Sequence, residues 1–178
     1  MRRLLLVAFL AVMSPCLGLV ISCGGSHRSD STVWVDSATG LKWQVSPTGV
    51  KMNWEEAKSH CKSLILGGSS DWRLPTITEL RSLIRGCPAT QKGGACGVTD
   101  SCLNNSSCWK EPCNGCSDKG GPGSDGAYWP PELSDAVSWY WSSSAVPDPG
   151  DDAWGVGFSS GYVNDKGRVG HGFARCVR

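Results

Sequence analysis

Cysteines are the residues of this sequence with the most chemistry to offer. The chain of 178 residues contains ten, of which Cys16 and Cys23 lie near its start, so that 10 − 2 = 8 follow. An even number of cysteines in an exported chain predicts up to four disulfides, formed among Cys61, Cys87, Cys96, Cys102, Cys108, Cys113, Cys116 and Cys176. The alternative is zinc, since Cys113 and Cys116 have the spacing of metal ligands, but an oxidising compartment disfavours free thiolates.

The C-terminal half contains one pattern that is typical of catalysis and two single residues of types that could be catalytic. Residues 157–161, GFSSG, match the GxSxG pattern of serine hydrolases, which requires a strand before it and a helix after it, whereas a hairpin is expected here. His171 has no evident catalytic partner, and Cys176 is among the cysteines expected in disulfides. We therefore expect no catalytic residue, no bound metal and no cofactor.

The first 22 residues have the pattern of a signal peptide. Arg2 and Arg3 precede an apolar run that continues to about Ile21. An uncleaved membrane anchor is disfavoured, because the run is barely long enough to span a bilayer and contains Pro15. Residues 1–22 are therefore expected to direct export and to be removed.

The end of this leader also predicts a lipid anchor. Residues 20–23, VISC, resemble a bacterial lipobox, which implies cleavage before Cys23 and lipidation of its thiol. The alternative is an ordinary signal peptide. Residues 23–31 are small and polar after the cysteine, which favours a flexible tether. We expect the protein in a bacterial cell envelope, at the outer membrane, with the lipid as its only membrane contact.

The charge of the mature chain excludes one class of partner. Removal of the leader leaves 17 − 2 = 15 Lys and Arg against 16 Asp and Glu, a net charge of −1. A nearly neutral chain has no field to steer it onto nucleic acid, so we expect none as a partner. The remaining 178 − 22 = 156 residues suit one domain, placed at residues 32–178.

Two elements are expected at the start of this domain. Residues 32–45 read as two short strands around a turn at 37–40. Asn53 and Glu56 form a capping box for a helix whose buried face comprises Trp54, Ala57, Cys61, Leu64 and Ile65.

The stretch DWRLPTITELRSLI at 71–84 predicts a second capped helix. Thr76 and Glu79 form the capping box after Pro75, and Gly86 suits the C-terminal stop. The buried stripe comprises Ile77, Leu80, Leu83 and Ile84. Asp71 and Arg73 face one side of an extended segment and are expected to brace loops, while Trp72 and Leu74 enter the core. We interpret Asp71, Trp72, Arg73, Pro75 and Glu79 as a folding motif and not as a catalytic site.

The second half begins with a cysteine-rich insertion at residues 87–127. Its six cysteines, its glycines and its lack of aliphatic periodicity indicate that disulfides hold it, in a pairing that the sequence leaves open. After it, alternation predicts an antiparallel meander: strands at 153–158, 162–163 and 168–177, with turns at 159–161 and 164–167.

Nine tryptophans suggest a role in recognition, because an exposed indole ring can stack on a sugar. We expect Trp34, Trp43, Trp54, Trp72 and Trp154 in the core. The candidates for exposure and ligand binding are Trp109, Trp129, Trp139 and Trp141.

Six motifs occur here in the order found in the bacterial DUF1566 family, also called the Lcl C-terminal domain: TGLKWQ (39–44), WxxAxxxC (54–61), DWRLPTITELRSLI, YWSSS (140–144), AWGVGF (153–158) and RCVR (175–178). The chain resembles that family over residues 32–178, apart from the insertion. The resemblance implies an α+β, C-type lectin-like fold, with two helices packed on a small twisted antiparallel sheet. It also implies a disulfide between Cys61 and Cys176. The collagen-like adhesin that gives the family its name binds sulfated glycosaminoglycans, but this chain has no collagen repeat and no excess of positive charge.

The expected function is non-enzymatic surface recognition or adhesion, with a glycan or protein ligand. The alternatives are an oxidoreductase that resembles formylglycine-generating enzymes and a purely structural envelope protein. Calcium binding in the manner of sugar-binding C-type lectins is not supported, because Glu111-Pro112 is followed by Cys113 and no Trp-Asn-Asp segment occurs. Asp148, Asp151 and Asp152 are interpreted as a solvated turn, with an oxygen site as the alternative.

Overall fold

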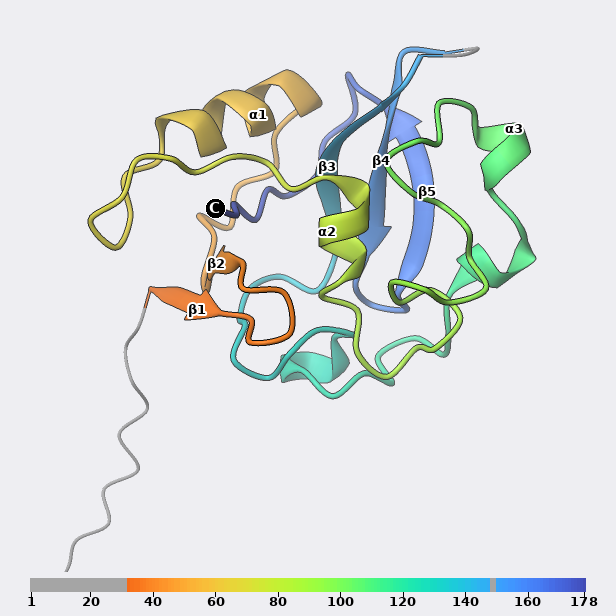
Figure 1. Cartoon of the computed structure of the whole chain (residues 1–178), viewed down its shortest axis with the longest axis horizontal. Coiled ribbons are helices and arrows are strands. Elements are labelled where there is room, and N and C mark those ends of the chain that lie inside the picture. Colours follow the sequence, from red (N-terminus) through yellow and green to blue (C-terminus); the bar gives the residue numbers. More distant parts are fainter. Residues whose placement is uncertain (1–31, 148–149) are drawn as a thin grey trace, which may run out of the picture.

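The computed structural model describes residues 32–147 and 150–178 (Figure 1). The predicted signal peptide, the lipid site at Cys23 and the tether lie outside the described residues. The described elements are β1 (Val33–Val35), β2 (Lys42–Gln44), α1 (Trp54–Ser63), α2 (Ile77–Arg81), α3 (Asn105–Cys108), β3 (Trp139–Val146), β4 (Asp152–Gly157) and β5 (Tyr162–Gly167), with single 3-10 turns at Glu111–Asn114 and Ser124–Gly126. The fold is a mixed α+β arrangement of small antiparallel sheets, short helices and four disulfides.

The predicted N-terminal hairpin is confirmed. Strands β1 and β2 pair antiparallel, and Gly40 closes the turn with a φ of +74°, which a residue with a side chain rarely adopts. The last residues of the chain extend this pair, since Val177 bridges Trp43 on one side and Arg73 on the other. The C-terminus therefore joins the hairpin to the 71–73 segment.

Helix α1 begins where its capping box predicts. The Glu56 amide donates to Asn53 Oδ1 over 3.0 Å, and the Asn53 amide donates to Glu56 Oε2 over 2.8 Å. Trp54, Ala57 and Cys61 are buried as expected. The prediction for Ile65 is wrong: it is 76% exposed, because the helix ends at Ser63 and the chain continues in extended form.

Helix α2 also begins at its predicted cap, Thr76, but ends at Arg81, well before Gly86. The Leu83 and Ile84 amides donate to the carbonyls three residues back, those of Leu80 and Arg81, each over 3.1 Å, so the α-helical pattern gives way to a tighter turn. The Arg85 amide then donates to the Tyr128 carbonyl over 3.0 Å. Gly86 still has the positive φ of a stop, +83°, and Ile77, Leu80, Leu83 and Ile84 are buried as predicted.

The larger sheet has the order β3-β4-β5 and is antiparallel throughout. The predicted turn at 164–167 is wrong, because these residues belong to β5 and pair with β4 along its whole length. The predicted strand at 168–177 is reduced to isolated bridges, one of them between Phe173 and Tyr140. The residue types at 164–167 favour a turn, but backbone pairing with β4, the central strand, holds these residues in a strand.

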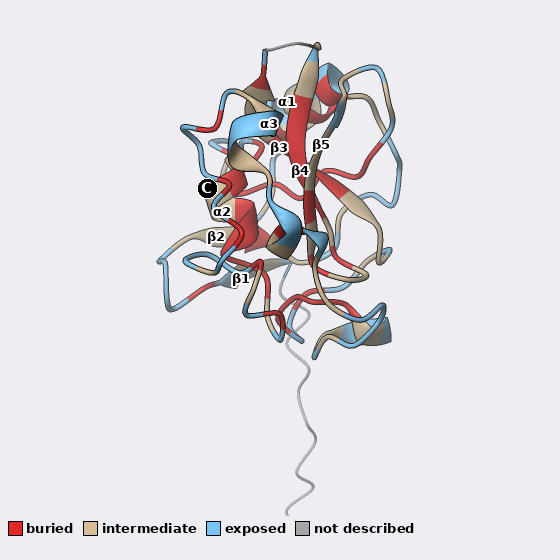
Figure 2. Ribbon diagram, turned by 90° about the vertical axis from the view of Figure 1, so that its right-hand side faces the viewer, coloured by how far each residue is buried: buried red, intermediate tan, exposed pale blue. Residues whose placement is uncertain are grey.

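The core lies between α2 and this sheet, and α2 and β4 appear largely in red in Figure 2. The insertion takes part in the core, since Cys96, Val98 and Cys113 are buried in the same cluster. Disulfides join Cys61 to Cys176, Cys87 to Cys116, Cys96 to Cys113 and Cys102 to Cys108. The Cys61–Cys176 bridge confirms the expectation from the resemblance, and Cys113 and Cys116 are disulfide-bonded and not zinc ligands.

No helix in residues 32–147 and 150–178 is long and apolar enough to cross a membrane.

Candidate functional site

Strand register gathers aromatic and small residues on one face of the β3-β4-β5 sheet. Trp139, Gly157 and Tyr162 lie opposite one another in one row across the three strands, and Trp141, Gly155 and Asn164 form the next row. Directly opposed residues of antiparallel strands point to the same side. We call the surface formed by Trp139, Gly157 and Tyr162 the aromatic face, since Trp141 and Gly155 of the next row are buried. The other side of the sheet presents Tyr140, Val156 and Val163 to the core.

The Trp139 indole lies on a floor of glycines. A Cβ atom at Gly155 would stand 2.5 Å from the Trp139 ring, and one at Gly172 would stand 2.7 Å from it. Both distances are far below contact distance, so a side chain at either position would collide with the indole ring. The Trp139 and Tyr162 ring centroids are 6.4 Å apart, and both residues remain half-buried and partly open to solvent. Two adjacent rings on an open sheet face form a surface on which an apolar sugar face can stack.

Polar groups border the ring pair on β5. The Asn105 amide of α3 crosses the strand edge and donates to Asn164 Oδ1 over 3.1 Å and to Asp165 Oδ1 over 2.6 Å. Burial, and then the charge of Asp165, raises the pKa of Tyr162. Burial, and then the charge of Asp152, raises the pKa of Asp165. Lys166 Nζ donates to the His171 carbonyl over 2.8 Å. The amide of Asn164 and the ammonium group of Lys166 therefore border the rings, and the Tyr162 ring itself carries a phenol hydroxyl.

The four tryptophans that were expected to be exposed differ in how far they are buried. Trp139 is half-buried on the aromatic face. Trp109 is also half-buried, and its indole donates to the Val163 carbonyl over 2.9 Å, which ties the insertion to β5. The expectation is wrong for Trp129 and Trp141, which are fully buried. Trp129 packs against Tyr140 and Phe158, and Trp141 donates to the Met52 carbonyl.

Core tryptophans were predicted better than exposed ones. Trp43, Trp54, Trp72 and Trp154 are buried as expected, while Trp34 is only half-buried. Sequence reasoning did not select Tyr162. The sequence did contain an indication of its place in the sheet, because Tyr162 follows the turn after a strand of alternating small and apolar residues.

Arg175 was missed as well, although it is the most completely buried charge. Its side chain has an exposed fraction of 0%, and its guanidinium donates to the carbonyls of Gln44 (2.7 Å), Val45 (2.5 Å) and Ser134 (2.8 Å). It also stands 4.8 Å from the Trp129 ring centroid. Burial lowers its pKa, and the same burial raises the pKa of Tyr140. Arg175 thus joins three separate loops and is a structural group.

Arg81 has the same role in the insertion. It lies on α2 and is nearly fully buried. Its guanidinium donates to the carbonyls of Thr90 (2.9 Å), Gln91 (3.0 Å), Cys96 and Val98. A single helical side chain therefore fixes both ends of the 90–98 loop.

The side chains of the Asp71 to Glu79 motif contact neighbouring segments of the chain. Arg73 binds Glu79 with two hydrogen bonds of 2.6 Å, and Glu79 also accepts from the Thr76 amide over 2.8 Å. Asp71 pairs with Arg178 over 2.7 Å. Trp72 and Leu74 are buried, and Pro75 accepts from the Ser143 amide over 2.7 Å through its carbonyl. The motif braces α2, β3 and the C-terminus.

Lowering the pH is expected to reduce the contribution of Glu79 to the stability of the fold. Burial by itself would raise the pKa of Glu79, but hydrogen bonds from Arg73 and Thr76 outweigh it and hold the pKa below its usual value of 4.5. A carboxylate with a lowered folded pKa stabilises the fold above its unfolded pKa and loses that effect as the pH falls through the folded pKa. The difference in unfolding free energy between the native protein and Glu79→Gln should therefore shrink as the pH falls below about 4.

Urea unfolding across this pH range measures the effect. Glu132→Gln is the matched control, because Glu132 is exposed and forms no ion pair within the described residues. If the difference in unfolding free energy between the native protein and Glu79→Gln stayed constant over the whole pH range, the prediction would be contradicted.

The described residues show no grouping typical of a metal site. No three His, Cys, Asp or Glu side chains of residues 32–147 and 150–178 lie close enough to hold a metal ion. Asp151 forms an ion pair with Arg168, and Asp148 lies outside the described residues.

One family model matches most of the chain. Residues 32–178 match the family described as the Lcl C-terminal domain, which covers 178 − 31 = 147 of the 178 residues. None of the curated proteins matches the chain.

Proposed function

We propose, from the premise that this chain belongs to the Lcl C-terminal domain family, that it is a non-enzymatic recognition module of the bacterial cell surface. It is exported, held at the outer membrane by a lipid on Cys23, and folded as a C-type lectin-like domain. Its ligand is a glycan, which the aromatic face binds without calcium. Four disulfides are consistent with an extracellular domain and support export into an oxidising compartment.

The observation that carries the proposal is the pair of partly open rings on a glycine floor. Trp139 and Tyr162 lie side by side on the sheet, and Gly155 and Gly172 leave room for the indole. A sugar ring placed there would contact both aromatic rings and meet the amide of Asn164 at the border. Trp109 is less suitable, because its indole N–H is already used by Val163.

A non-enzymatic role is favoured over the formylglycine-generating alternative by the state of the cysteines. That chemistry needs reactive thiols in the C-terminal half, where Cys176 is joined to Cys61. The rings of the aromatic face likewise favour recognition over a purely structural role, which would not require aromatic side chains open to solvent.

Glycan binding is expected to depend on the Tyr162 ring. The oxidised protein is applied to a glycan and polysaccharide array, with and without calcium and at two salt concentrations. Tyr162→Ala and Trp139→Ala should each weaken binding about tenfold, since loss of one ring contact removes about 1.4 kcal/mol. Tyr162→Phe is the matched control, because it keeps the ring and should keep the binding.

Thermal unfolding of each variant separates loss of ligand from loss of fold. Calcium-independent binding that disappears in a folded Tyr162→Ala protein would support the proposal. An array with no bound glycan would contradict it and would favour a protein ligand, for which the insertion is the first segment to use as bait.

A further inference from the structure

A groove of about 390 Å³ lies beside the N-terminal hairpin, away from the aromatic face. We call it the hairpin groove. Its apolar lining comes from Val33, Val35, Leu66 and Trp72, and its cationic lining comes from Lys42 and Arg178. The groove thus combines aliphatic and aromatic surface with an ammonium group, that of Lys42, which is free of ion pairs within the described residues, and a guanidinium group, that of Arg178, which is paired with Asp71.

The walls of the hairpin groove are fixed by contacts across the sequence. The Trp72 indole donates to the carbonyls of Leu66 and Ser69, each over 3.2 Å, and holds the 66–69 turn against the hairpin. Val35 and Lys42 are opposed residues of β1 and β2. Arg178 is oriented by its ion pair with Asp71, whereas Lys42 forms no ion pair within residues 32–147 and 150–178.

Two exposed apolar residues either line this groove or adjoin its lining in the sequence, and we call them its rim. Val35 is 53% exposed, and Ile65, next to Leu66, is 76% exposed. Exposed apolar residues beside cations are typical of surfaces that lie in the headgroup region of a bilayer.

The groove also lies where the described chain begins. Thr32, the first described residue, is part of its lining. The expected lipid site, Cys23, precedes Thr32 by 32 − 23 = 9 residues, which span at most about 30 Å when fully extended. The hairpin groove therefore lies within reach of the point where a lipid anchor would hold the chain.

We propose that the hairpin groove and its rim dock on the anionic surface of the bilayer that carries the lipid anchor. Lys42 and Arg178 contact phosphate groups of the lipids, and Val35 and Ile65 enter the headgroup layer. The inference rests on the anchorage at Cys23 proposed above. A free anion would use the two cations but would leave the apolar rim without a role.

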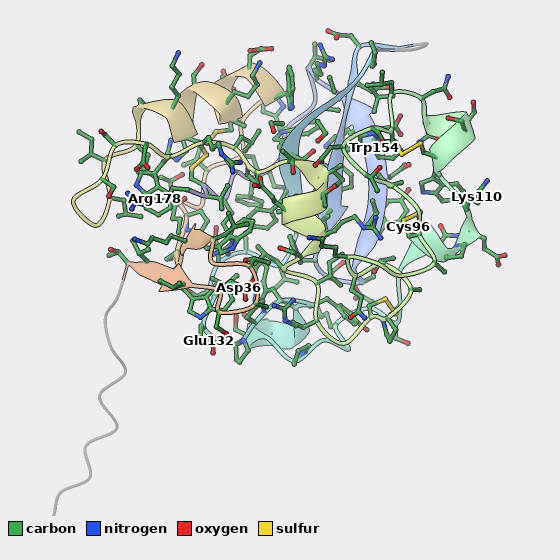
Figure 3. The ribbon with its side chains drawn as sticks, in the orientation of Figure 1. Asp36, Cys96, Lys110, Glu132, Trp154 and Arg178 are labelled. Atoms are coloured by element: carbon green, nitrogen blue, oxygen red, sulfur yellow. A yellow bond between two sulfur atoms is a disulfide. The ribbon has the colours of Figure 1, made fainter. Side chains whose placement is uncertain are left out.

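Docking in this orientation has a consequence for the rest of the domain. Figure 3 shows Arg178 and Lys110 on opposite sides of the molecule. With the hairpin groove against the bilayer, the part of the cysteine-rich insertion around Lys110 points away from the membrane. The docked groove, together with the anchor, then holds the domain in one orientation.

Chemical labelling of lysines tests the docking on the lipidated chain itself. The chain is reconstituted in vesicles of phosphatidylcholine alone and of phosphatidylcholine with phosphatidylglycerol in equal amounts. An amine-reactive reagent is then applied, and mass spectrometry measures the labelling of Lys42 and of Lys110. The labelling of Lys42 is expected to fall about fivefold in the anionic vesicles and to recover in high salt, while Lys110 stays unchanged.

A second arm tests the apolar rim with substitutions at exposed positions, which leave the fold intact. Ile65→Ser should restore much of the labelling of Lys42 on anionic vesicles. Val169→Ser is the matched control, because Val169 is 87% exposed and lies outside the groove lining. It should leave the protection of Lys42 as it is.

The outcomes distinguish the two proposals. A chain that sediments with the vesicles but shows equal labelling of Lys42 in both kinds would keep the anchor and overturn the docking. A chain that does not sediment with either kind would overturn the anchor and, with it, the docking.

Discussion

Replacing Cys61 and Cys176 together with alanine is expected to lower the free energy of unfolding by about 4 to 5 kcal/mol. The bridge closes a loop with a sequence separation of 115 residues, the longest of the four. In the chain-entropy account, a longer loop restricts the unfolded chain more. Both cysteines are also fully buried, between α1 and the C-terminal segment. The midpoint of thermal unfolding should fall by about 10 to 20 °C, as measured by circular dichroism.

The bridge between Cys102 and Cys108 provides the control. Its sequence separation is only 6, so the same double replacement should cost about 2 kcal/mol. Equal losses for the two bridges would contradict the loop-length argument. They would indicate that packing around the sulfur atoms, and not the restriction of the unfolded chain, determines the effect.

Arg175→Met is expected to destabilise the fold by about 3 kcal/mol or more. The substitution keeps much of the side-chain volume but leaves the carbonyls of Gln44, Val45 and Ser134 without their shared donor. A buried acceptor that loses its donor costs about 1 to 3 kcal/mol, and this applies most to the buried Gln44, because Val45 keeps the Ser134 amide as a donor and Ser134 is exposed. The contact of the guanidinium with the Trp129 ring is lost as well. Urea unfolding measures the difference.

Arg168→Met is the matched control for this substitution. Arg168 has partners of the same kinds at a half-buried position: the exposed Asp151, the Asp152 carbonyl (3.1 Å) and the Trp54 ring (4.3 Å to the centroid). Its replacement should therefore cost less, about 1 to 2 kcal/mol. An Arg175→Met protein that is as stable as the native one would show that the cost of burying the charge cancels the hydrogen bonds. A loss as small as that of Arg168→Met would lead to the same conclusion.

The local elements were the most predictable part of the fold. The caps at Asn53 and Thr76 and the turn closed by Gly40 occur where the sequence places them. Each depends on residues within four positions of one another, so a short segment carries the whole signal. The helix ends were less predictable, because α2 gives way at Leu83 to hydrogen bonds that reach back three residues, although Gly86 has the φ of a helix stop.

The aromatic face was predictable only in part. Trp139 was selected from the sequence, but Trp129 and Trp141 were selected with it and are buried, and Tyr162 was not considered. Whether an indole is open to solvent depends on what packs over it, and for Trp129 this includes Arg175. Neighbouring prolines and serines gave no indication of that contact.

By itself, the sequence determined the family, the caps, the hairpin and the presence of disulfides, because each rests on residue types at short or fixed spacings. The tertiary structure decided the pairing of the cysteines in the insertion, the burial of Arg81 and Arg175, and the inclusion of residues 164–167 in β5. It also brought Trp139 and Tyr162 together and assembled the hairpin groove from β1, β2, the 66–69 turn and the C-terminus. These features depend on contacts between segments far apart in the chain, where burial and strand pairing outweigh local propensity.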